Sequence, residues 1–120
     1  YDFRFPELAR LMVNLGAKII LVPAAFNMTT GPLHWELLFQ SRAVDNQVFT
    51  IGTAPARNLN ASYHSYGHSI IVSPWGKILN QADFEETALF TINLNEINLV
   101  REQIPLLRHR RLDIYELTQK

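Results

Sequence analysis

One pair of histidines in this chain has a spacing that could suggest a metal site. His64 and His68 are four residues apart, a spacing that places two side chains on one face of a helix. However, Gly67 lies between them, the surrounding stretch is not helical in pattern, and there is no cysteine to complete a ligand set. The sequence therefore predicts no metal site and no cofactor.

A short cationic run lies near the end of the chain, at Arg108, His109, Arg110 and Arg111. Such runs can bind nucleic acids or act as targeting signals. Here the run is only four residues long and has no interleaved aromatic residues, and the chain has 11 basic and 11 acidic side chains. We interpret it as a solvated or ion-paired end, and expect no nucleic-acid or membrane partner.

Cysteine is absent, so the chain has neither a thiol nucleophile nor a disulfide framework. No apolar run approaches the roughly 18–20 residues that span a bilayer, and no signal-peptide pattern opens the sequence. These features predict an intracellular protein, which we expect to be cytoplasmic.

Hydrophobic periodicity predicts alternating helices and strands. A helix is predicted from Pro6 to the stop at Gly16, followed by a buried strand at 18–22. After a loop at 24–32, a helix is predicted over 34–46, with Trp35, Leu38, Phe39 and Arg42 on one face. Strands are predicted at 48–53, 69–73, 77–79 and 87–93, with a turn at 74–76, and a last helix at 95–103. This order, in a chain with 48% hydrophobic residues, is typical of a single α/β unit.

Several sequence blocks resemble the nitrilase superfamily, also called the carbon–nitrogen hydrolases. They are 1–8 (Tyr-Asp-Phe-Arg-Phe-Pro-Glu-Leu), 23–27 (Pro-Ala-Ala-Phe-Asn), 31–38 (Gly-Pro-Leu-His-Trp-Glu-Leu-Leu), 42–47 (Arg-Ala-Val-Asp-Asn-Gln), 54–57 (Ala-Pro-Ala-Arg), 66–69 (Tyr-Gly-His-Ser) and 73–76 (Ser-Pro-Trp-Gly). Together they cover nearly the whole chain, in order. The blocks at 26–32 and 41–47 are most similar to the ω-amidases, which hydrolyse the terminal amide of 2-oxoglutaramate and 2-oxosuccinamate.

The resemblance implies an α/β fold that is part of a four-layer αββα sandwich, and a homodimer paired through a helical face. Residues 1–120 would form the C-terminal half of one carbon–nitrogen hydrolase domain, starting just after the catalytic cysteine. The first residue, Tyr1, agrees with this expectation, because the chain opens without a leader or a polar, frayed terminus. We expect this half alone to be inactive, and poorly soluble because two sheets that the other half should cover would be left bare.

The resemblance also implies a Glu–Lys–Cys triad, which would lie upstream of this chain. The resemblance gives Tyr1 the backbone N–H of the oxyanion hole, Arg4 the grip on a substrate carboxylate, and Phe26 and Thr30 the opposite wall of the pocket. Each has a structural alternative: Tyr1 as an ordinary turn residue, Arg4 paired with Asp2 or Glu7, Phe26 in the core and Thr30 stabilising a turn. Arg57, Asp45 and Asn46 are interpreted as buried polar anchors of the scaffold.

Two other functions remain open at this point. One is an amidase acting on deaminated glutathione, which shares the opening block. The other is a non-catalytic module that keeps the scaffold and binds a partner through its helical face. Retention of Arg4, Phe26 and Thr30 favours an amidase over a bare scaffold.

Overall fold

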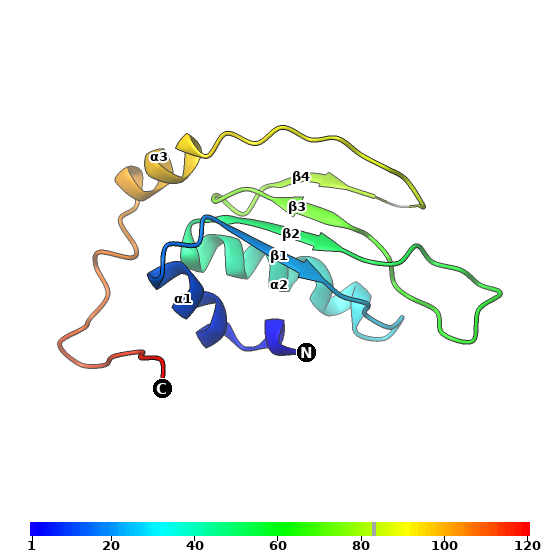
Figure 1. The fold of residues 1–120 in the computed structure, drawn as a ribbon, viewed down its shortest axis with the longest axis horizontal. Helices are drawn as coiled ribbons and strands as arrows, with labels where there is room; N and C mark the ends of the chain where they lie inside the picture. Colours follow the sequence, from blue (N-terminus) through cyan, green and yellow to red (C-terminus); the bar gives the residue numbers. More distant parts are fainter. Residues whose placement is uncertain (83) are drawn as a thin grey trace.

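A four-stranded mixed sheet carries two helices on one face in this computed structural model, which describes residues 1–82 and 84–120 (Figure 1). The strands are β1 (Ile19–Pro23), β2 (Phe49–Thr53), β3 (Ile70–Val72) and β4 (Ile78–Gln81), in that order across the sheet. The helices are α1 (Pro6–Asn14), α2 (Gly31–Asn46) and α3 (Asn95–Gln103), and a short 3-10 helix, η1 (Asp2–Arg4), precedes α1. The predicted α/β class is confirmed.

The helix α2 is the crossover of a parallel β–α–β unit. β1 and β2 pair in parallel, with Ile19 opposite Phe49 and Pro23 opposite Thr53. β2 then pairs with β3, and β3 with β4, in antiparallel order. The turn that joins β3 to β4 is closed by a hydrogen bond of 2.8 Å from the Gly76 N–H to the Ser73 carbonyl, as the predicted hairpin requires. Because β1 and β2 run the same way, both end at the same edge of the sheet.

The core lies between the sheet and the two helices. α2 contributes Trp35, Phe39 and Ala43, which pack on Ile70 and Val72 of β3, and all five are essentially inaccessible to solvent. A second cluster joins α1 to β1 through Ala9, Val13, Ile20 and Val48. Alternate residues of each strand therefore point at the helices, as the two-residue period of a strand dictates.

The opposite face of the sheet is apolar and only partly covered. Leu21 of β1 is 67% exposed on this face. Ile51 and Ile71 line a hollow of about 330 Å³ that residues 86–88 border. An exposed apolar sheet face of this kind is normally covered by another layer, and the family sandwich predicts a second sheet there.

Helix α2 begins three residues before the predicted start at His34, with Gly31. Pro32 was assigned to the loop, but it occupies the first turn of the helix, where its missing N–H costs nothing. The backbone N–H of Gly31 donates to the Asn27 carbonyl at 2.8 Å, so the loop closes directly onto the helix.

The predicted strand at 87–93 is wrong. Within the described part of the chain, these residues form no strand, and no backbone hydrogen bond joins them to β4. Leu89, within this segment, is 99% exposed. An extended segment becomes a strand only where a sheet edge accepts its N–H and C=O groups, and this one runs from β4 to α3 without pairing (Figure 1).

The last helix is fixed to the end of α2 by polar side chains. Gln47, in the left-handed conformation that ends α2, donates from Nε2 to the Ile104 carbonyl at 2.5 Å. Arg101 of α3 donates to the Asn46 carbonyl at 3.3 Å, and Arg10 of α1 donates to the Asp45 carbonyl at 2.5 Å. Two guanidinium groups thus satisfy carbonyls at the negative end of the α2 dipole, and burial lowers the pKa of both.

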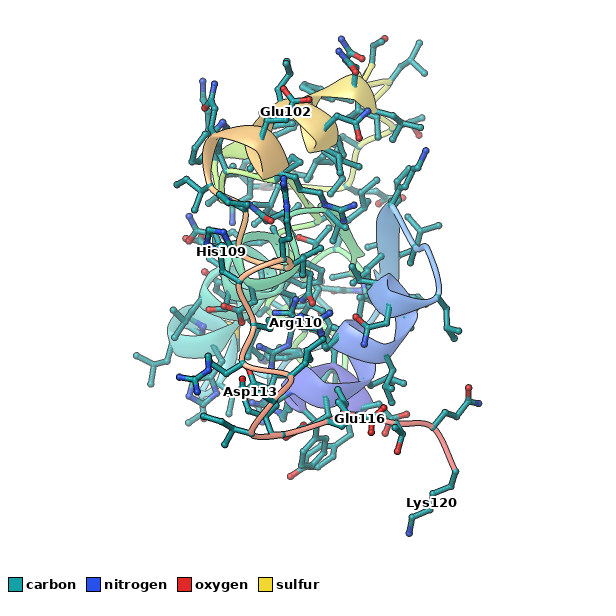
Figure 2. All side chains as sticks on the ribbon, turned by 90° about the vertical axis from the view of Figure 1, so that its left-hand side faces the viewer. Glu102, His109, Arg110, Asp113, Glu116 and Lys120 are labelled. Carbon is teal, nitrogen blue, oxygen red and sulfur yellow. The ribbon has the colours of Figure 1, made fainter. Side chains whose placement is uncertain are left out.

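The C-terminal segment leaves α3 and runs past the ends of α1 and α2, as Figure 2 shows from the side. Leu107 packs against the α1–β1 cluster, which attaches the segment to the body of the molecule. Arg111 pairs with Asp113 at 2.6 Å, and this contact lowers the pKa of the Asp113 carboxyl. The interpretation of the basic run as a solvated, ion-paired end is confirmed for this arginine.

Of the three predicted polar anchors, only Asn46 is buried, where it donates to the Arg42 carbonyl at 2.9 Å. The side chain of Asp45 is 51% exposed, and Arg57 lies on the exposed loop between β2 and β3. Within the described residues, no helix is both long enough and apolar enough to cross a membrane.

Candidate active site

The candidate site begins at the short turn that precedes α1. The N–H of Arg4 donates to the Tyr1 carbonyl at 3.0 Å, which closes the 3-10 turn η1. Arg42 of α2 donates from Nη2 to the Arg4 carbonyl at 2.8 Å. Arg42 is buried, and this burial lowers the pKa of its guanidinium, although Asp45 lies 4.0 Å away. The backbone of the turn is therefore tied to the longest helix of the protein.

The Arg4 side chain extends across the loop that follows β1. Its guanidinium carbon lies 4.6 Å from the centre of the Phe26 ring and 5.9 Å from the centre of the Tyr1 ring. Its Nη1 is 3.1 Å from Nδ1 of His34, in the first turn of α2. An aromatic face and a neutral ring nitrogen attract a cation but do not neutralise its charge.

Arg4 has no acidic partner among the described residues. The structural alternative considered from sequence was an ion pair with Asp2 or Glu7, and neither is found within the part of the chain that the structure describes. A part-buried guanidinium without a carboxylate can accept one from a ligand, with up to two charge-assisted hydrogen bonds. The geometry therefore leaves Arg4 able to bind an anion.

Thr30 is held in place by Asn27. The Asn27 Oδ1 accepts hydrogen bonds from the N–H groups of Thr29 and Thr30, at 3.0 and 2.8 Å. The Thr30 hydroxyl donates to the same oxygen at 3.0 Å. Its proton is thus directed at Asn27, and the hydroxyl must rotate before it can donate to a ligand in the cleft. The turn-stabilising alternative for Thr30 therefore describes a real contact, alongside its place on the cleft wall.

Phe26 packs against the hydrophobic core. Its ring meets Trp35 edge-on at 5.1 Å, and its carbonyl accepts from the Tyr66 N–H at 2.7 Å. Trp35 in turn donates from Nε1 to the His68 carbonyl at 2.7 Å. A Cβ on Gly31 would come within 2.3 Å of the Tyr66 ring, so the start of α2 needs glycine there. Phe26 is both a core contact and the platform under Arg4.

These groups surround an open cleft of about 590 Å³ at the edge where β1 ends. It is lined by Tyr1, Arg4, Pro23, Ala24, Ala25, Phe26, Asn27, Thr30 and Tyr63. All four residues predicted for the site, Tyr1, Arg4, Phe26 and Thr30, lie on its wall. The carboxyl end of a strand in an α/β sheet is where ligands commonly bind.

Sequence reasoning missed two residues of this region. Tyr63 lines the cleft from the loop between β2 and β3, with its hydroxyl 3.4 Å from the Ala25 carbonyl. His34 contacts Arg4, although the sequence analysis placed it only at the start of a helix. The only signal for His34 was its position in the first turn after Gly31, which faces the loop that carries Phe26.

The histidines first weighed as a metal pair have other contacts. His64 lies 3.1 Å from the Leu59 carbonyl through Nε2, within its own loop. His68 lies 2.7 Å from the Tyr66 carbonyl through Nδ1, and its ring stacks on Tyr66 at 4.0 Å. Both rings therefore take part in the structure of the loop that leads into β3.

The structure is that of an α/β protein with an open cleft at the end of its first strand, and Arg4 lies on the wall of that cleft. The family model for carbon-nitrogen hydrolases matches residues 1–102. The chain therefore belongs to the carbon-nitrogen hydrolase family.

Curated relatives include Omega-amidase NIT2-A of Xenopus laevis, 51% identical across the whole chain, and Omega-amidase NIT2 of Homo sapiens, 47% identical. The chain covers 44% of the length of each. Among solved structures, Saccharomyces cerevisiae Nit3, a member of branch 10 of the nitrilase superfamily, has a TM-score of 0.87 and 52% identity, over 92% of this chain and 41% of that one. The NitFhit protein of C. elegans has a TM-score of 0.90 and 39% identity, over 98% of this chain and 29% of that one.

Proposed function

We propose that this chain forms the carboxylate-binding side of the active site of an ω-amidase-type carbon–nitrogen hydrolase. The substrate is a small oxo-dicarboxylic acid amide, such as 2-oxoglutaramate or 2-oxosuccinamate, and the products are the dicarboxylic oxo acid and ammonia. The observation that supports this proposal is the Arg4 guanidinium, which lies on the cleft wall without an acidic partner among the described residues.

The substrate class follows from what Arg4 can bind. An oxo-dicarboxylic acid amide keeps one free carboxylate at the end remote from its amide. The planar guanidinium fork matches a carboxylate with two parallel hydrogen bonds, and the guanidinium carbon lies 4.6 Å from the centre of the Phe26 ring. The amide end would then extend toward Tyr1, beside which the family places its nucleophile.

The chemistry requires groups that are not in these 120 residues. A glutamate takes the proton of the cysteine thiol, and the thiolate attacks the amide carbon. The resulting oxyanion is stabilised by a lysine and by the Tyr1 backbone N–H. The C–N bond breaks and ammonia leaves with a proton from the glutamic acid. Water then hydrolyses the thioester to the acid and regenerates the thiol. Because the chain contains no cysteine, it cannot form the thioester by itself.

Two of the wall residues have distinct parts in this proposal. Phe26 is the platform for Arg4. Thr30 contributes an oxygen whose proton is directed at Asn27, so it presents lone pairs to the cleft and can accept from a hydrated oxo group or an ordered water. To donate a hydrogen bond to the substrate, the Thr30 hydroxyl would have to rotate away from the Asn27 Oδ1. That oxygen would still accept from the backbone N–H groups of Thr29 and Thr30.

The test compares two amides with the whole enzyme, in which this chain is joined to the Glu, Lys and Cys. An ω-amidase hydrolyses 2-oxoglutaramate with a much higher kcat/KM than deaminated glutathione. A strong preference for the peptide would overturn the substrate assignment and favour the deaminated-glutathione amidase. Absence of hydrolysis of either amide, in a folded protein that has the triad, would favour a non-catalytic binding module. The 120-residue chain alone, as the matched control, should release no ammonia.

The outer surface of the helices suggests a partner for the whole protein. Leu33 and Leu37 of α2 are 69% and 59% exposed, and Leu8 of α1 is 45% exposed. Large apolar side chains exposed on neighbouring helices are typical of an interface. The proposed assembly is a homodimer paired through this face. Light scattering on the whole protein should give twice the subunit mass, and Leu37→Lys should shift it toward the monomer; a monomeric parent protein would contradict the pairing.

A further inference from the structure

The hydrogen bond between Arg4 and His34 fixes the state of the histidine. A guanidinium has only donors, so at the 3.1 Å contact the His34 Nδ1 must be the acceptor. The imidazole is then neutral, with its proton on Nε2. A proton on Nδ1 would place two N–H groups face to face and, in the imidazolium form, two cations in contact.

The backbone places His34 beside Arg4. His34 is part-buried in the first turn of α2, where its backbone N–H donates to the Thr30 carbonyl at 2.8 Å. The acceptor role of its ring therefore follows from the contact with Arg4 itself.

The Arg4 guanidinium is held by two groups that do not quench its charge. The guanidinium carbon lies 4.6 Å from the centre of the Phe26 ring, and Nη1 donates one N–H to His34. An aspartate or glutamate in the place of His34 would hold the guanidinium equally well, but would neutralise the charge that a substrate carboxylate needs. A neutral acceptor orients the fork and leaves its remaining N–H groups for the cleft.

We propose that His34 is a positioning residue, which aims the Arg4 guanidinium at the carboxylate of the substrate by accepting from its Nη1. This inference rests on the proposed function, since it assigns His34 a part in the same carboxylate site. His34 acts through Arg4. It does not line the cleft wall, and we do not expect it to contact the nucleophile.

The kinetic test uses variants that differ in where they offer an acceptor. His34→Asn places a carbonyl oxygen close to the position of Nδ1, His34→Gln places it one bond further out, and His34→Phe keeps a ring without an acceptor. In the whole enzyme, kcat/KM is measured for 2-oxoglutaramate and for pentanamide, a neutral amide of the same chain length. His34→Phe and His34→Gln should lower the ratio of the two values about tenfold or more, mainly through the KM for 2-oxoglutaramate, while His34→Asn should restore it to within about threefold.

A merely structural role would reduce turnover of both amides together and would not be rescued by asparagine, and that result would overturn the proposal. His109→Phe is the matched control, because His109 is exposed on the C-terminal segment (Figure 2).

A spectroscopic test is independent of the substrate. Nitrogen-15 NMR of the labelled whole enzyme should show His34 with an unprotonated Nδ1 and a protonated Nε2 at neutral pH, and Arg4→Met should change the Nδ1 signal. A protonated Nδ1 would overturn the positioning role whatever the enzyme hydrolyses. Failure to hydrolyse 2-oxoglutaramate with the NMR result intact would instead overturn the proposed function alone.

Discussion

Substitution of Arg4 gives the most informative test of the carboxylate site. Arg4→Lys keeps one positive charge but loses the fork, so a carboxylate held by two parallel hydrogen bonds would keep one. It also removes the guanidinium contact with the Phe26 ring, at 4.6 Å from the ring centre. Loss of one such contact corresponds to about 1.4 kcal/mol, a tenfold rise in the KM for 2-oxoglutaramate. Arg4→Met removes the charge as well and should raise the KM about a hundredfold, twice that free-energy change.

The turn that carries Arg4 should survive both substitutions. It is closed by the bond from the Arg4 N–H to the Tyr1 carbonyl and held by Arg42 at the Arg4 carbonyl, and neither contact uses the Arg4 side chain. The effect on binding can therefore be separated from an effect on folding.

Initial rates of ammonia release by the whole enzyme measure both quantities, with pentanamide as the substrate that lacks a carboxylate. The rise in KM should be confined to the acidic substrate. An unchanged KM for 2-oxoglutaramate in the two folded variants would refute the reasoning and leave Arg4 with a structural role only.

Three further substitutions test other parts of the account. Gly52→Ala should destabilise the protein by about 1–3 kcal/mol in denaturant unfolding, because the new Cβ would come within 2.4 Å of the buried Phe39 ring; unchanged stability would mean that α2 moves away freely. Gln47→Ala should cost about 1–3 kcal/mol and speed hydrogen exchange in α3, because carbonyls at the end of that helix lose their donor; equal exchange would show that α3 is held by apolar contacts alone. The Asp113 carboxyl should titrate below its usual pKa of 3.8, since the ion pair with Arg111 is present above the folded pKa and is lost as the pH falls through it; an Asp113 pKa that Arg111→Met leaves unchanged in NMR would contradict the pairing.

The local signals of the sequence predicted most of the fold. The helix from Pro6 and the strand before Pro23 are punctuated by proline at positions where its fixed φ and missing N–H are tolerated. The face of α2 that carries Trp35, Phe39 and Arg42 is buried as its spacing predicted. Such elements are predictable because periodicity and end signals are local.

The sequence did not correctly predict features that depend on contacts with residues far away in the chain. The alternation at 87–93 contains apolar residues at strand spacing, but pairing needs an edge, and no such edge is hydrogen-bonded to this segment in the described residues. Asp45 and Arg57 were expected to be buried, yet burial of a charge depends on what packs over it. Composition and spacing carry no information about which residues pack over a charged side chain.

The candidate site also combines residues that were predicted from the sequence with a contact that was not. Tyr1, Arg4, Phe26 and Thr30 were named from resemblance, and the structure brings them to one cleft. The contact between Arg4 and His34 joins residues 30 positions apart, and no local pattern signals it. Their roles in catalysis stay predictions.

The most direct test of the carboxylate site is a crystal structure of the whole enzyme with its product, 2-oxoglutarate. We expect the product to lie in the cleft between Tyr1 and Thr30, with one carboxylate on both outer nitrogens of Arg4 and the other directed toward Tyr1. His34 should still contact Nη1, and Phe26 should still lie against the guanidinium. A product bound in this cleft with Arg4 turned away, or with both carboxylates held by residues outside this chain, would show that Arg4 does not bind the substrate carboxylate.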